Sequence, residues 1–216
     1  MTDIKGVIFD LDGTLLDSMQ MWRNVEENYL RSLGVTPPPD LSLIVRSLSS
    51  VEEAEYFRAD LGVILSVEEI VDGRNRMIED FYFYEARMKE GVVPVLEALS
   101  KRGIKMCVAT ATERDLVEPA MLRCGIMKYF ERIFTCDEEE TSKTNPEIFY
   151  RAATFLGTEV SGTLVVEDAL YAMKSAKKAG FQVAGVYDLS ADDQQGEIKE
   201  LCDYYWDTLN DMLAIL

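Results

Sequence analysis

Five short apolar runs, rich in β-branched residues and separated by helix signals, constrain this chain more than any other feature. They cover residues 6–9, 104–109, 132–135, 162–166 and 182–186. Because the runs are almost continuously apolar rather than alternating, they are typical of strands buried on both faces of a parallel sheet. Helix signals that close on a glycine separate the later runs, at residues 94–101, 113–123, 146–156 and 169–179. This alternation predicts an α/β protein with an open parallel sheet and helices on both faces.

Residues 17–90 interrupt the alternation, because they carry helix signals but no convincing strand. Apolar residues recur there at steps of three and four, at Met19, Trp22, Val25, Tyr29 and Leu33. Two capping-box pairs predict the starts of further helices, Ser50 with Glu53 and Ser66 with Glu69. We therefore expect two parts, an α/β core formed by residues 1–16 plus 91–216 and a helical insertion over residues 17–90.

The chain has no histidine and is strongly acidic, with a formal net charge of −17 at pH 7 and a pI near 4.4. The missing histidine excludes Ser-His-Asp and Cys-His nucleophiles, histidine bases and zinc sites built on histidine. The acidic surface repels nucleic acid and anionic membranes, so we expect neither as a partner. Binding of a phosphorylated ligand has to rely on local positive charge.

Cysteine usage and the N-terminal sequence favour the cytoplasm. The four cysteines are scattered and form no CxxC pair, and Cys107 lies inside an apolar run, which predicts a buried thiol. The first apolar stretch is too short for a signal peptide or a membrane span. The sequence leaves the oligomeric state open, and a monomer is the default expectation.

Side chains capable of chemistry gather where the predicted strands end. They are the segment Asp10-Leu11-Asp12-Gly13-Thr14, Thr110, Lys143 ahead of Asn145-Pro146, and Glu167-Asp168. Ligands of open α/β sheets bind at the carboxyl ends of strands, where all of these would meet. Two close carboxylates persist most easily when a cation lies between them, while a hydroxyl near a helix N-terminus and a lysine suit an anion. Each residue alone has an ordinary explanation as a turn, a helix cap or a solvated charge, but together they predict a site.

In this order the segments resemble the four motifs of the haloacid dehalogenase (HAD) superfamily, and the chain is identified as a member on them. The insertion is similar to the helical cap of the subclass that holds phosphoglycolate-phosphatase-like enzymes and β-phosphoglucomutase. The resemblance implies a Rossmann-like core with an inserted all-helical cap, and an enzyme that acts on a small phosphorylated metabolite.

The resemblance also implies roles for single residues. Asp10 would be the nucleophile that forms an aspartyl-phosphate, and Asp12 would protonate the leaving oxygen and then deprotonate water. Thr110, the neighbouring Ala111 and Lys143 would hold the phosphoryl oxygens. The physical logic agrees, since a carboxylate approaches a phosphate dianion only when cations offset the repulsion.

The implied metal is Mg²⁺, held by Asp10, the backbone carbonyl of Asp12 and Asp168, with Glu167 just behind these ligands. Hard oxygen ligands suit that ion. The chain departs from the usual pattern at Ala169 and Ala172, where relatives with this cap carry Ser and Gly, and at Ser142, where Gly is frequent. Neither departure removes a metal ligand.

Three functions stay open. Asp12 argues against haloacid dehalogenases and phosphonate hydrolases, which lack it, and leaves phosphatase and phosphosugar mutase. Thr14 and the missing histidine favour a phosphatase, because mutases of this type often carry Val after the glycine and place a histidine on the first cap helix. A β-phosphoglucomutase-like mutase is the alternative, and a non-catalytic relative that binds a phosphorylated ligand is the third hypothesis.

The insertion is expected to set substrate specificity by closing over the strand ends. Candidates for a second anionic group of the substrate are its basic side chains Arg46, Arg58, Arg74, Arg76 and Lys89. Trp22 and Tyr29 could stack on a ring. For each of these basic and aromatic residues, ordinary surface or cap packing is the favoured explanation. The sequence does not identify the substrate.

Overall fold

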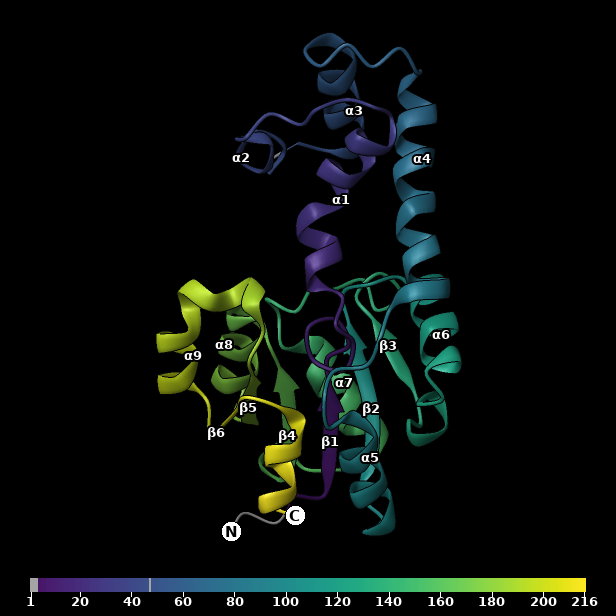
Figure 1. The fold of residues 1–216 in the computed structure, drawn as a ribbon. Helices are drawn as coiled ribbons and strands as arrows, with labels where there is room; N and C mark the ends of the chain where they lie inside the picture. Colours follow the sequence, from purple (N-terminus) through teal and green to yellow (C-terminus); the bar gives the residue numbers. More distant parts are fainter. Residues whose placement is uncertain (1–3, 47) are drawn as a thin grey trace. The chain divides into compact units, whose positions relative to one another are not determined.

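The computed structural model describes residues 4–46 and 48–216, and its contacts divide the chain into two compact units. The core unit comprises Met1–Met19 and Ala86–Leu216, and the helical unit comprises Gln20–Glu85. Figure 1 shows the strands gathered in the core unit, and the described residues of the other unit form helices without strands. Each unit is described by itself below.

The core unit is built on one sheet whose six strands all pair in parallel, in the order β3-β2-β1-β4-β5-β6. The strands are β1 (Gly6–Phe9), β2 (Lys105–Thr110), β3 (Ile133–Thr135), β4 (Thr163–Glu167), β5 (Gln182–Val186) and β6 (Tyr204–Trp206). The five predicted strands are confirmed. All four residues of β1 and all five of β4 are buried, as the continuous apolar runs predicted. The sixth strand, the three-residue edge strand β6, was not predicted from the sequence.

The chain crosses from β1 to β2 in one direction and later returns to β4 on the other side of β1. Phe9 pairs with both Val108 of β2 and Val166 of β4, so the three strand ends lie side by side. The point where the strand order reverses is where ligands of open α/β sheets bind. The topology therefore places Asp10 and Glu167 at this point.

Helices cover both faces of the sheet, as predicted (Figure 1). They are α5 (Val92–Lys101), α6 (Arg114–Arg123), α7 (Glu147–Leu156), α8 (Leu170–Lys178) and α9 (Gln195–Leu201), with short turns η2 (Met127–Tyr129), η3 (Val160–Gly162), η4 (Leu189–Gln194) and η5 (Leu209–Ala214). Crossovers between parallel strands are right-handed, so α5 and α6 lie on one face and α7 and α8 on the other. On the second face, Phe149 and Met173 pack with Ile8 and Val165 in one apolar cluster.

The helical unit contains α1 (Met19–Ser32), which begins in the core unit, α2 (Leu41–Val45), α3 (Ser50–Ala59), α4 (Val67–Asp80) and the π-helical turn η1 (Phe81–Glu85). Its own apolar cluster includes Tyr29 and Leu30 of α1, Phe57 of α3 and Ile70 of α4. This separate cluster explains why the unit is compact without a sheet.

One of the two predicted capping boxes is correct and the other is displaced by one residue. Ser66 caps α4 together with Glu69, as predicted. At α3, however, Ser49 is the N-cap and pairs with Glu52, whereas Ser50 is the first helical residue. The sequence repeats the required spacing one residue apart, and the pairing that forms leaves Glu53 buried inside the unit.

Two short hydrogen-bonded segments of the core unit lead into and out of the helical unit. The Asp17 N–H donates to the Arg87 carbonyl at 2.8 Å, and the Lys89 N–H donates to the Leu15 carbonyl at 3.0 Å. The compact helical unit, Gln20–Glu85, lies inside the insertion predicted over residues 17–90.

Among the described residues, no helix combines the length and apolar character needed to cross a membrane.

Candidate active site

The loop after β1 is a tight turn held by its own backbone. The Asp10 N–H donates to the Val166 carbonyl at 2.9 Å, which continues the line of β1. The Leu11 carbonyl then accepts the N–H groups of Leu15 and Leu16, each at 2.8 Å. Gly13 has a φ of +83°, and a Cβ at this position would collide with the carboxylate of Asp168. Glycine is required both for the left-handed backbone and for the close approach.

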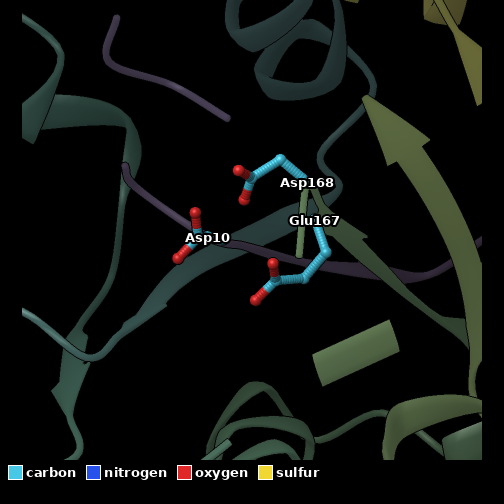
Figure 2. Close-up of side chains that lie close together, drawn as sticks. All are labelled: Asp10, Glu167 and Asp168. Carbon is cyan, nitrogen blue, oxygen red and sulfur yellow. The ribbon is translucent and has the colours of Figure 1, made fainter. Parts of the chain in front are cut away.

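Three carboxylates meet beside this loop. Ligand oxygens of Asp10, Glu167 and Asp168 all lie within 4.8 Å of one another, and Figure 2 shows the side chains converging. The residues are 6%, 1% and 3% exposed, respectively. Burial of three acids this close together is unfavourable unless cations accompany them.

Lys143 supplies one positive charge to this group. It is 4% exposed, and its Nζ donates to Asp10 Oδ1 and, at 2.6 Å, to Glu167 Oε1. Asn145 Oδ1 accepts the N–H of Glu147 at 3.1 Å, which fixes the start of α7 just after the lysine. The structure thus brings together four of the predicted site residues.

The charges perturb one another strongly. Burial raises the pKa of Asp10 to about 7 although Lys143 lowers it, and Glu167 and Asp12 raise it further. Burial and the neighbouring Asp10 and Glu167 raise the pKa of Asp168 well above its ordinary value. Burial alone would lower the pKa of Lys143, but Asp10 and Glu167 raise it. Lys143 therefore stays protonated, but its single positive charge does not balance the three neighbouring carboxylates.

The cluster can accommodate a divalent cation. When all three carboxylates are ionised, they leave a surplus of two negative charges against the one ammonium group in a buried site. The Asp10 Oδ2 atom is buried and has no hydrogen-bond partner among the described residues, while the other carboxylate oxygen of Asp10 binds Lys143. Carboxylate oxygens of this kind are the ligands that Mg²⁺ prefers. The donor set fits a hard divalent ion.

Two hydroxyls hold the carboxylate of Asp12. Ser18 Oγ donates to Asp12 Oδ1 at 2.5 Å, and Thr112 Oγ1 donates to Asp12 Oδ2 at 2.7 Å. Sequence reasoning missed both donors. Ser18 carries no local signal, whereas Thr112 lies two residues beyond Thr110 and could have been suspected from the strand end.

Thr110 is the last residue of β2 and is 1% exposed, and its hydroxyl accepts the N–H of Thr112 at 3.1 Å. Ala111 follows at the surface.

The two alanines that depart from the family pattern have different surroundings. Ala172 is fully buried, so α8 packs around its methyl group. The N–H of Ala169, the other departure, donates to Glu167 Oε2 at 3.1 Å.

Three residues suggested for substrate recognition are engaged elsewhere. Arg74 binds Glu26 at 2.8 Å and Glu53 at 3.5 Å inside the helical unit. Tyr29 is 4% exposed, and its ring lies against Gly73. Lys89 makes three hydrogen bonds within the core unit. These side chains have structural partners, and only Arg46, Arg58 and Arg76 of the basic candidates are exposed.

Comparison with known proteins decides the family. The family model for haloacid dehalogenase-like hydrolases matches residues 7–186, which include every residue of the site described above. The chain belongs to this family. As a haloacid dehalogenase-like hydrolase, it carries the α/β fold and the acidic strand ends in the expected order.

The relatives of this haloacid dehalogenase-like hydrolase include phosphatases. It is 29% identical to the N-acetylmuramic acid 6-phosphate phosphatase of Pseudomonas aeruginosa over 187 residues, which cover 85% of this chain and 81% of the relative. A crystal structure of a candidate β-phosphoglucomutase from Thermotoga maritima superimposes with a TM-score of 0.83 at 22% identity and 98% coverage of both chains. A predicted phosphoglycolate phosphatase from Haemophilus somnus gives 0.78 at 22% identity, covering 100% of this chain and 99% of that one. Both structures share the fold of this protein.

Proposed function

We propose that this protein is a Mg²⁺-dependent phosphatase that hydrolyses a small phosphorylated metabolite through an aspartyl-phosphate on Asp10. The observation that carries the proposal is the state of the Asp10 carboxylate. One oxygen binds the Lys143 ammonium, and the other is buried beside Asp168 with no hydrogen-bond partner in the part of the chain that the structure describes. The unpartnered oxygen would bind the metal ion, and Lys143 offsets the negative charge of the carboxylate, so the oxygen beside the ammonium can attack phosphorus.

In the first step an Asp10 oxygen forms a bond to phosphorus, and the bond to the leaving oxygen breaks. Asp12 gives its proton to that oxygen, with its carboxyl oriented by Ser18 and Thr112. Lys143 offsets the charge of the nucleophile and, with Thr110 and the Ala111 backbone, holds the phosphoryl oxygens.

In the second step water attacks phosphorus, and Asp12 takes a proton from that water. The Asp10 carboxylate leaves, and inorganic phosphate is released. The same residue thus acts as acid and then as base, as the order of the two steps requires.

Asp10, the backbone carbonyl of Asp12 and Asp168 would hold Mg²⁺. When bound, the ion neutralises charge on the phosphoryl oxygens and on the nucleophile. Glu167 keeps Lys143 in place, since one of its oxygens accepts from the lysine and the other from the Ala169 N–H.

The helical unit acts as the cap in this proposal and selects the substrate. Arg46, Arg58 and Arg76 are its exposed basic candidates for a second anionic group. The indole of Trp22 already has a partner inside the helical unit, because its Nε1 donates to the Tyr82 hydroxyl at 2.8 Å. A phosphosugar mutase is the alternative function, and it would require a bisphosphate activator.

Release of inorganic phosphate from a panel of small phosphate esters, with and without Mg²⁺, tests the proposal. We expect metal-dependent release by the wild type and a loss of several orders of magnitude in Asp10→Asn. Release without metal, or substantial activity of the variant, contradicts the site assignment. If no ester of the panel releases phosphate, and sugar phosphates are converted only when a bisphosphate is added, the protein is the mutase instead.

A further inference from the structure

Lys89 has an arrangement that its sequence position did not suggest. Its Nζ donates to the Gly13 carbonyl at 2.6 Å, to the Tyr187 carbonyl at 2.7 Å and to Asp188 Oδ2 at 2.8 Å. An ammonium group has three donors, and all three are used. Lys89 thereby joins the loop after β1 to the segment after β5.

The side-chain contact of Lys89 falls on the glycine of the catalytic loop, whose N–H donates to the Leu16 carbonyl at 2.8 Å. Gly13 has a φ of +83° and follows Asp12 directly. Glycine lacks a Cβ and has wide conformational freedom, so the peptide that follows it needs an external restraint to stay in one orientation. Lys89 supplies this restraint from one side, while the Asp168 carboxylate packs against Gly13 from the other.

Asp188 keeps the ammonium in place. It is 7% exposed, and its second oxygen accepts the Ser190 N–H at 2.9 Å. Burial raises the pKa of Asp188, but hydrogen bonds from Lys89 and Ser190 lower it below its ordinary value overall. The Asp188 charge is therefore balanced by Lys89, close to a site that already has excess negative charge.

The backbone of Lys89 adds a second attachment. Its N–H donates to Leu15, and the neighbouring Met88 bridges to Leu16. The side chain of Lys89 thus binds the Gly13 carbonyl and its backbone binds the Leu15 carbonyl, at two points in the turn that directly follows Asp12.

We propose that Lys89, supported by Asp188, is a positioning residue that fixes the Gly13 peptide and thereby the orientation of Asp12. The proposal rests on the proposed function, in which Asp12 transfers the proton. It assigns Lys89 to the catalytic loop rather than to binding of the substrate.

Lys89→Met removes the ammonium and retains the aliphatic stem. Small displacements of a catalytic group can cost about 100-fold in rate, so we expect kcat for p-nitrophenyl phosphate to fall about 10- to 100-fold with little change in KM. Lys101→Met is the matched control, because that lysine is 77% exposed and pairs only with Glu97 among the ion pairs of the described chain. A rise in KM at unchanged kcat would show that Lys89 binds substrate and would overturn the proposal.

The double variant Lys89→Met/Asp188→Asn separates positioning from stability. In Lys89→Met alone Asp188 is buried without its cation, so the thermal midpoint falls, and Asp188→Asn should restore it because Asn also caps a helix turn. If Lys89 positions Asp12, kcat stays low in the double variant. Recovery of kcat together with stability would contradict the proposal. If Lys89→Met does not fold, the double variant decides alone.

Hydrogen exchange of the Gly13, Leu15 and Leu16 amides provides a readout that needs no activity. These amides donate within the turn, and we expect faster exchange in Lys89→Met and in the double variant than in the control. Unchanged exchange overturns the inference even in an active enzyme. If the wild type hydrolyses no ester, the proposed function fails while the exchange result still tests the restraint.

Discussion

At the scale of single residues, the balance of buried charge around Lys143 governs both stability and reactivity. Lys143→Met leaves Asp10, Glu167 and Asp168 without their ammonium group. Breaking a buried ion pair from one side costs about 3–5 kcal/mol, so we expect that loss in the free energy of unfolding at pH 8, together with loss of activity. The loss should shrink at pH 6, because Asp10, with its pKa already raised to about 7, then takes up a proton.

Chemical denaturation at the two pH values measures this effect. Lys101→Met is again the control, since surface substitutions change stability by about 0.5 kcal/mol or less. Equal stability of Lys143→Met and the wild type at pH 8 would show that the acids are already neutral without the lysine.

The Thr112 hydroxyl allows a test of how Asp12 is oriented. Thr112→Val keeps the shape and removes the donor to Asp12 Oδ2. Loss of such a supporting hydrogen bond costs about 10- to 100-fold in activity at comparable sites, and we expect a fall of that size in kcat. Thr112→Ser retains the hydroxyl and should keep most of the rate. A valine variant with normal kcat would remove Thr112 from the account.

Single-residue chemistry was predictable where it depends on strand ends and was not where it depends on distant partners. Asp10, Glu167 and Asp168 follow buried strands, so parallel pairing had to bring them together. Lys89 instead meets partners 76 and 99 residues away, at Gly13 and Asp188. A lone charge in the sequence does not indicate such partners, so Lys89 was only one of five basic candidates for substrate binding, with ordinary surface or cap packing as the favoured explanation.

At the scale of elements, the start of α3 is where the sequence prediction and the structure differ, because Ser49 rather than Ser50 is the N-cap. Ser49→Ala removes the side chain that caps the helix, and we expect a loss of about 1 kcal/mol in the free energy of unfolding. Ser50→Ala changes an exposed first helical residue and should be nearly neutral, because alanine is a good helix former. Thermal unfolding of both variants measures the difference, and the opposite ranking would restore Ser50 as the cap.

The packing of α1, α3 and α4 predicts an unusual pH dependence. Arg74 of α4 is shared between Glu26 of α1 and Glu53 of α3, so one cation faces two carboxylates. Burial raises the pKa of Glu53 from 4.5 to about 7, although Arg74 lowers it, and Glu26 adds to the rise. Between these pH values the folded form binds more protons than the unfolded chain, so stability falls as pH rises through that window.

Glu53→Gln removes this contribution while preserving the volume of the side chain. We expect the variant to exceed the wild type by about 1–3 kcal/mol at pH 8 and to lose its advantage at pH 4.5. Unfolding free energies over this pH range measure the difference. A variant less stable than the wild type at pH 8 would mean that the ion pair with Arg74 outweighs the cost of burial.

The strands that could be predicted from the sequence are those that consist mostly of apolar residues. The five predicted strands are buried on both faces, which leaves a continuous apolar run in the sequence. The edge strand β6 contains two partly exposed tyrosines in three residues, so it has no recognisable pattern. The start of α3 was misplaced because two overlapping Ser–Glu pairs satisfy the same spacing, and the sequence alone does not distinguish them.

At the scale of the whole molecule, an acidic protein has to attract a phosphate ester. A net charge of −17 repels an anion at long range, so attraction has to arise locally. The described core places Lys143 among the acids, and the three acids fit a divalent cation beside it. This arrangement is the physical basis of the proposed dependence on Mg²⁺.

Trapping of the covalent intermediate tests the central claim most directly. In Asp12→Asn, p-nitrophenyl phosphate should still phosphorylate Asp10, because nitrophenolate leaves without a proton, whereas hydrolysis of the intermediate needs the missing base. With Mg²⁺ present we expect a burst of one nitrophenolate per site, and peptide mass spectrometry after acid quenching should place the phosphoryl group on Asp10. Steady turnover without a burst and without label on Asp10, or label that persists in Asp10→Asn, would contradict the account.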